Sequence, residues 1–171
     1  MAMAGQGKER KAKKSLWEIV KFLLVSCLVS IIQLVLVNAL YFGMQGWTAP
    51  LPEWLAGIFS EQTMGAGHSN WGYVLPFFLS NLIANIYGYF QNRATTFKAK
   101  NVPKWCLAVY LVVLFALILF CTWLQGVVVN WVQALGVTEA LAPTIAMAVA
   151  GAVQYAVLFP LEKFVLFKPR P

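Results

Sequence analysis

The segment WCLAVYLVVLFALILFCTWLQGVVV, residues 105–129, decides the fold class of this chain. No Asp, Glu, Lys or Arg interrupts it. A helix needs about 20 mostly apolar residues to cross the ~30 Å hydrocarbon core of a bilayer. Because this segment is longer than that, it predicts a transmembrane helix.

Three further segments, residues 22–42, 73–90 and 141–159, have a similar apolar character and comparable length. Of the 171 residues, 60% are hydrophobic and 11% are charged, which is too few charges to cover a soluble domain. We therefore expect an all-α, polytopic membrane protein in one domain, 1–171, with four transmembrane helices arranged as two hairpins. The remaining segments are a basic tail (1–16), an outer loop with an interfacial helix near 52–61 (43–72), a basic cytoplasmic loop (91–104), a second outer loop (130–140) and a second basic tail (160–171).

The basic residues predict the orientation, because Lys and Arg near the ends of spans are retained on the cytoplasmic side. With four spans, all 13 of them fall on one face. Both termini and the loop 91–104 are therefore expected to be cytoplasmic. The basic tails are either this topology signal or a site for anionic lipids, and nucleic-acid binding is not expected. The residues concerned are Lys8, Arg10, Lys11, Lys13, Lys14, Lys21, Arg93, Lys98, Lys100, Lys104, Lys163, Lys168 and Arg170.

Neither a metal site nor a cofactor is expected. The opposite face carries Glu53, Glu61, Glu139 and His68, and this histidine has no nearby acidic or cysteine partner. The three cysteines lie in apolar runs without a CxxC spacing. The sequence also lacks a Walker-type glycine loop, a GxSxG elbow and an HExxH pair, so no enzyme is indicated.

An internal repeat relates the ends of the second and fourth spans. Residues 87–98 read YGYFQNRATTFK, and residues 157–168 read VLFPLEKFVLFK. Two hairpins related by an axis along the membrane normal would explain this similarity; the alternative is that any span ends with a cation and an aromatic residue. An offset of 70 aligns Arg93 with Lys163, Phe97 with Phe167 and Lys98 with Lys168.

Polar side chains within the spans are candidates for binding, because an amide without hydrogen bonds in hydrocarbon costs about 2–7 kcal/mol. Two readings remain open: the amides bridge helices within the bundle, or they form a ladder that holds a polar headgroup while a cation grips its phosphate. No carboxylate lies in the middle of a span, since Glu18 and Glu162 are near the ends; this disfavours a proton-coupled exporter. The candidate residues are Asn81, Asn85, Gln91, Asn92, Arg93, Gln33, Gln154 and Lys163.

The chain resembles GtrA-like membrane proteins, the family that includes the GtrA and GtcA proteins of cell-surface glycosylation. The resemblance rests on the four-span layout, on FFLSNLIANIYGYFQNRATTF (77–97) and on EKFVLF (162–167). It implies a bacterial cytoplasmic membrane protein that moves a polyprenyl-phosphate-linked sugar to the outer leaflet. There the sugar would be transferred onto wall polymer, teichoic acid or lipopolysaccharide.

In this interpretation Asn81, Asn85, Gln33 and Gln154 line a groove, while Arg93 and Lys163 recruit the phosphate. We expect passive transfer by a homo-oligomer or a lipid-open groove, with membrane glycosyltransferases as partners. Two alternatives remain: a scaffold that holds a glycosyltransferase and transports nothing, and a small four-span multidrug exporter.

Overall fold

The computed structural model describes residues 2–64 and 69–168, and the side chains of residues 13–61, 64 and 69–168. His68 and Arg170 lie outside the described residues, as do the side chains of Lys8, Arg10 and Lys11. The described residues form the following helices, given in chain order: α1 Ala2–Met44, α2 Glu53–Ala56, α3 Glu61–Met64, α4 Trp71–Gln91, the π-helical turn η1 Asn92–Thr96, α5 Lys104–Ala134, α6 Ala142–Pro160 and the π-helical turn η2 Leu161–Leu166.

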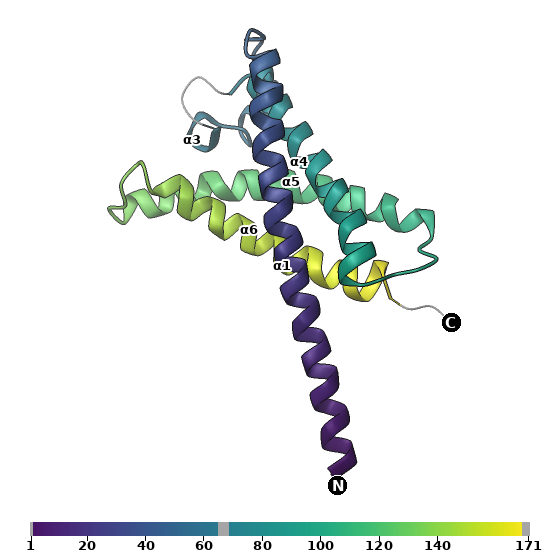
Figure 1. Cartoon of the computed structure of the whole chain (residues 1–171). Helices are drawn as coiled ribbons and strands as arrows, with labels where there is room; N and C mark the ends of the chain where they lie inside the picture. Colours follow the sequence, from purple (N-terminus) through teal and green to yellow (C-terminus); the bar gives the residue numbers. More distant parts are fainter. Residues whose placement is uncertain (1, 65–68, 169–171) are drawn as a thin grey trace.

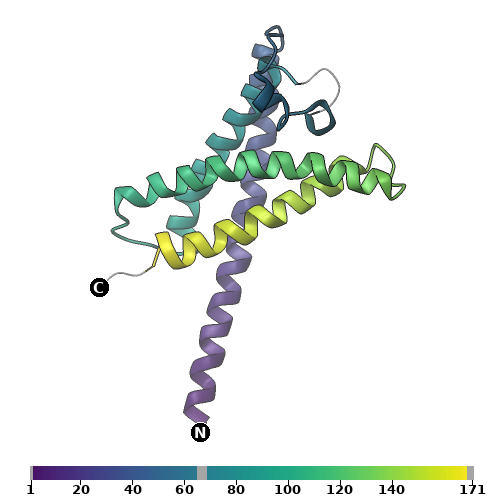
Figure 2. The same ribbon diagram turned by 180° about the vertical axis from the view of Figure 1, so that it is seen from behind.

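The described part of the chain forms two helical pairs that cross. α1 packs along α4, and α5 packs along α6 (Figure 1). Figure 2 shows from behind that the second pair lies across the first instead of beside it. The expected hairpins therefore form, and they meet near the ends of α4 and α6.

Among the described residues, three helical segments are long and apolar enough to cross a membrane: Lys13–Met44, Lys104–Ala134 and Ala142–Leu166. These correspond to the first, third and fourth expected spans and are compatible with a multi-pass membrane protein. The second expected span forms helix α4, but it is not among the three. Its Ser and Asn side chains lower its apolar character, and several of them are buried against the other helices.

Apolar side chains also cover the outside of the helices. Leu34 of α1 and Val112 of α5 expose 64% and 71% of their surface. Soluble proteins rarely expose long apolar stripes, whereas lipid tails cover them without penalty. The outer surfaces thus support the same conclusion as the composition.

The connection between α1 and α4 differs from the single interfacial helix expected near 52–61. In its described residues this connection contains one short turn of helix in α2 and another in α3. Phe59, between them, is 1% exposed and packs with Met64 and Val74 in a small apolar cluster. Burial of this ring holds the loop against the helices, so the segment folds back as a cap on α4 and α5.

The ends of α4 and α6 make the same turn at aligned positions. The amide of Phe97 donates to the carbonyl of Asn92 over 2.9 Å, and the amide of Phe167 donates to that of Glu162 over 2.8 Å. In both, the amide of residue i+5 bonds to the carbonyl of residue i. Such π-helical bonds are rare, and they add one residue to the hydrogen-bonded turn. Their separation by 70 residues supports the internal repeat.

Aromatic contacts between the two ends follow the same symmetry. The rings of Tyr89 and Phe167 are 5.1 Å apart, and those of Phe159 and Phe97 are 6.1 Å apart. Since Tyr89 aligns with Phe159 at the same offset, each contact is the counterpart of the other. The two hairpins therefore dock through equivalent surfaces.

α1 and α4 pack closely at Gly88. A Cβ added to Gly88 would lie 2.7 Å from Cγ2 of Val29 on α1. A β-branched residue in a helix has one strongly preferred rotamer, so this methyl group has little freedom to move. Gly88 thus sets the spacing of this helix pair.

We expect Gly88→Ala to lower the stability by about 1–3 kcal/mol relative to Gly151→Ala, because an added methyl overpacks a tight contact. Gly151 is the matched control, since it is also helical and a Cβ there meets nothing within 4 Å. Thermal unfolding in detergent measures the difference. Adding Val29→Ala to Gly88→Ala should restore most of the loss; equal stability of the two single variants would contradict the assignment.

Candidate functional site

A cavity of about 430 Å³ opens between α1, α4 and α6. Binding sites for small molecules generally measure about 300–1,000 Å³. Apolar residues form most of its wall, and no Lys or Arg is among the described residues that line it. Its polar lining residues are Ser26, Ser30, Gln33, Asn85, Asn92, Tyr110, Gln154, Tyr155 and Glu162.

Asn85 is the centre of a hydrogen-bond network in the cavity wall. Its Nδ2 donates to Oδ1 of Asn81 over 2.7 Å, and its Oδ1 accepts a bond of 3.0 Å from Nε2 of Gln154. The hydroxyl of Tyr110 donates to its backbone carbonyl over 2.9 Å. Three helices are therefore joined through this one residue, and its side-chain amide bridges α4 and α6 through Gln154, as in the helix-bridging interpretation.

Asn92 and Glu162, the aligned residues of the two π-helical turns, form a second polar centre. A side-chain hydrogen bond joins them, and Thr96 donates to Oδ1 of Asn92 over 3.0 Å. Glu162 is 1% exposed and Asn92 is 4% exposed. The repeat therefore brings an amide and a carboxyl group together in the interior.

Four of the expected site residues line this cavity: Gln33, Asn85, Asn92 and Gln154. Asn81 lies behind Asn85 and contacts it, but it does not reach the cavity. Gln91 points elsewhere and donates to the hydroxyl of Tyr87 over 2.9 Å at the surface. Of the amides expected to form a ladder, Asn85 and Asn92 therefore line the cavity, and Asn81 and Gln91 do not.

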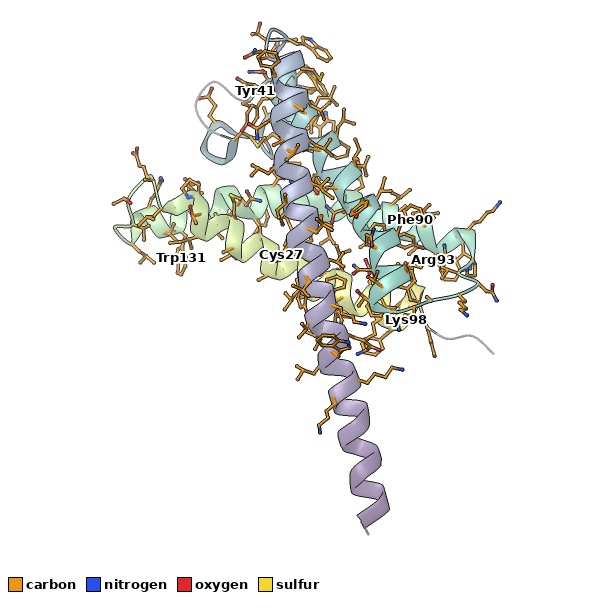
Figure 3. The ribbon with its side chains drawn as sticks, in the orientation of Figure 1. Cys27, Tyr41, Phe90, Arg93, Lys98 and Trp131 are labelled. Carbon is orange, nitrogen blue, oxygen red and sulfur yellow. The ribbon has the colours of Figure 1, made fainter. Side chains whose placement is uncertain are left out.

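The two expected phosphate-binding cations lie away from the cavity. Arg93, in η1, is partly exposed and has no ion-pair partner among the described side chains. Figure 3 shows it with Lys98 at the end of α4 that lies away from Tyr41. Lys163 is engaged: its Nζ lies 3.0 Å from the Glu18 carboxylate and 2.7 Å from Oγ of Ser15.

Lys163 belongs instead to a second hollow of about 390 Å³. This hollow also contains Lys14 from the first basic segment and Lys168 from the last. Phe97, from the loop that follows α4, lines it as well. Three basic segments far apart in the sequence therefore meet at one end of the molecule.

Sequence reasoning missed the role of Glu162 in the cavity wall. Hydropathy predicts that Glu162 lies at the end of a span, whereas the structure buries it against Asn92. The offset of 70 would have identified it, because the repeat aligns it with a candidate residue. Tyr110 and Tyr155 were also missed, and their aromatic character gave no signal that distinguished them from other core rings.

The cavity combines apolar walls with hydrogen-bonding groups of both kinds. Amides and hydroxyls donate and accept, and the carboxyl group of Glu162 accepts. Cys27, which is exposed midway along α1, forms part of its rim (Figure 3). Such a site suits a small polar group attached to an apolar one.

The chain matches no known family model, no curated protein and no solved structure.

We expect Asn85→Leu to destabilise the protein by about 1 kcal/mol, because Gln154 loses its acceptor in apolar surroundings. For a chain of this size that loss corresponds to a fall in Tm of about 2–4 °C. Gln33→Leu is the control, since Gln33 lines the same cavity without a hydrogen-bond partner among the described residues. A thermal shift of the same size in both variants would show that the network is not structural.

Proposed function

We propose that this chain carries a polyprenyl-phosphate-linked monosaccharide from the cytoplasmic to the outer leaflet of a bacterial membrane. The cavity between α1, α4 and α6 is the observation that carries the proposal. A sugar has many hydroxyl groups, each of which is costly to move through hydrocarbon unless other hydrogen bonds replace those to water. The polyprenyl chain stays in the lipid throughout.

The proposed arrangement in the membrane has four spans, with α4 as the second, and both termini in the cytoplasm. α4 tolerates its amides because Asn81 and Asn85 bond to each other and Asn85 also bonds to Gln154 of α6. The charge distribution supports the orientation, since Lys14 from the first basic segment lies in the same hollow as Lys163 and Lys168 from the last. Because the two hairpins cross, we expect them to tilt in opposite directions across the bilayer.

Arg93 is the cation that we propose for recruiting the phosphate. Its guanidinium is partly exposed beside the end of α4, and a guanidinium binds phosphate through paired hydrogen bonds. Lys163 has the weaker case because Glu18 already holds it. The lipid would thus approach at the basic end, with anionic lipids accumulating at the same face.

The resemblance to GtrA-like proteins fits this proposal and adds membrane glycosyltransferases as partners, with a homo-oligomer as the expected assembly. The cavity walls come from a single chain, so each subunit would hold its own site. Transport would be passive, driven by consumption of the sugar on the outside.

The experiment is transbilayer transport in proteoliposomes that contain a radiolabelled polyprenyl-phosphate sugar. We compare the parent with Gln33→Leu, which removes a polar group from the cavity, and with Arg93→Ala. Gln133→Leu, at the exposed end of α5, is the matched control. The first two variants should fold and lose at least tenfold in rate, whereas the control keeps the rate of the parent.

Parent-like rates in Gln33→Leu and Arg93→Ala would reject the cavity and the cation as parts of the path. A parent that transports no lipid-linked sugar, yet restores glycosylation in cells, would instead establish the scaffold. Transport of cationic drugs by the parent would favour an exporter, for which the buried Glu162 supplies the carboxylate that such a protein needs.

A further inference from the structure

Two buried polar atoms lack a hydrogen-bond partner among the described residues: Oε2 of Glu162 and the hydroxyl oxygen of Tyr155. Both residues line the cavity described above. Buried polar groups are nearly always hydrogen-bonded, and an unmet acceptor costs about 1–3 kcal/mol or more when charged. Because both residues line the same cavity, their location indicates that a ligand in the cavity supplies the missing hydrogen bonds.

The chemistry of the two groups limits what that partner can be. A carboxyl group accepts hydrogen bonds whether or not it is protonated and also donates one when it is protonated, and a tyrosine hydroxyl both donates and accepts. A phosphate carries negative charge into the cavity, and no Lys or Arg from the described residues lines the cavity to neutralise it. Adjacent hydroxyl groups of a sugar can donate hydrogen bonds to the carboxyl group of Glu162. They can also both donate to and accept from the hydroxyl of Tyr155.

The remaining polar groups of the cavity point to the same ligand. Asn85 and Gln154 are held by each other, whereas Gln33 has an amide without a described partner. The rings of Phe22 and Tyr155, 5.2 Å apart, form an apolar surface beside these groups. An uncharged polyhydroxy group with an apolar face matches this combination.

Resting on the function proposed above, we propose that Glu162 and Tyr155 bind the hydroxyl groups of the sugar in this cavity, while the phosphate stays outside it at the basic end. The sugar therefore enters first, and the phosphate remains near Arg93. Asn92 is a positioning residue, because its hydrogen bond to Glu162 leaves Oε2 free for the ligand.

The experiment measures binding, not transport, with the full chain in nanodiscs of phosphatidylethanolamine and phosphatidylglycerol. Purification avoids glycoside detergents, because their sugar headgroups would compete for the cavity. Radiolabelled polyprenyl-phosphate glucose is displaced by unlabelled polyprenyl phosphate carrying glucose, galactose, N-acetylglucosamine or no sugar. The quantity compared is the preference for the best sugar-bearing lipid over bare polyprenyl phosphate.

Glu162→Gln and Tyr155→Phe are the test variants. Glutamine retains the shape and an acceptor for Asn92, but it can place an NH₂ group where Oε2 stands; phenylalanine removes only the hydroxyl. Glu139→Gln in the exposed α5–α6 connection and Tyr41→Phe in the far part of α1 are matched controls. Thermal unfolding of each variant checks that it is folded.

We expect the parent to prefer a sugar-bearing lipid by at least tenfold, and each test variant to lose about threefold to tenfold of that preference. Affinity for bare polyprenyl phosphate should stay the same, and both controls should behave as the parent. Full preference in Glu162→Gln and Tyr155→Phe, as expected if ordered water satisfies both atoms, would overturn the proposal. So would a parent without preference for any of the three sugars.

The two proposals fail separately. A parent that transports the lipid while both test variants keep the sugar preference would retain the function and remove this site. A parent that binds the sugar through Glu162 and Tyr155 but transports nothing would retain the site and remove the transport function.

Discussion

A polar pair buried where two helical hairpins meet constrains this structure. Asn92 and Glu162 occupy equivalent positions in the repeat, and both are almost inaccessible. A carboxyl group in such surroundings needs hydrogen-bond donors, since neither lipid nor apolar side chains supply them. The rings of Tyr89, Phe97 and Phe167 pack against one another where the hairpins meet, so the apolar packing and the polar pair both join the two hairpins.

The same constraint explains why one helix can be polar and still belong to the apolar part of the molecule. α4 contributes Asn81 and Asn85 to the interior, where their side chains bond to each other and to Gln154 of α6. These amides lie on the buried side of the helix, whereas Ile83 and Phe90 of the same helix are exposed. Hydropathy averaged over α4 therefore includes amides that face other helices and not the outside of the molecule.

The sequence predicted the helical class and the two hairpins, because long uncharged runs and short connections are local properties. It also predicted four of the cavity residues, since an amide in an apolar run stands out. It could not predict that the hairpins cross, because the crossing depends on contacts between the two pairs, such as Gln154 with Asn85 and Tyr89 with Phe167. The ion pair of Lys163 with Glu18 joins residues far apart in the chain, and nothing in either segment indicates that partner.

The cysteines have an unequal distribution that gives experimental access to the cavity. Cys106 and Cys121 are buried in the core, whereas the thiol of Cys27 is exposed on α1 at the rim of the cavity. A maleimide reagent would therefore react at one native position among the described residues, without any engineered change. Fluorophores or spin labels attached there would report hydration and distance changes beside the cavity.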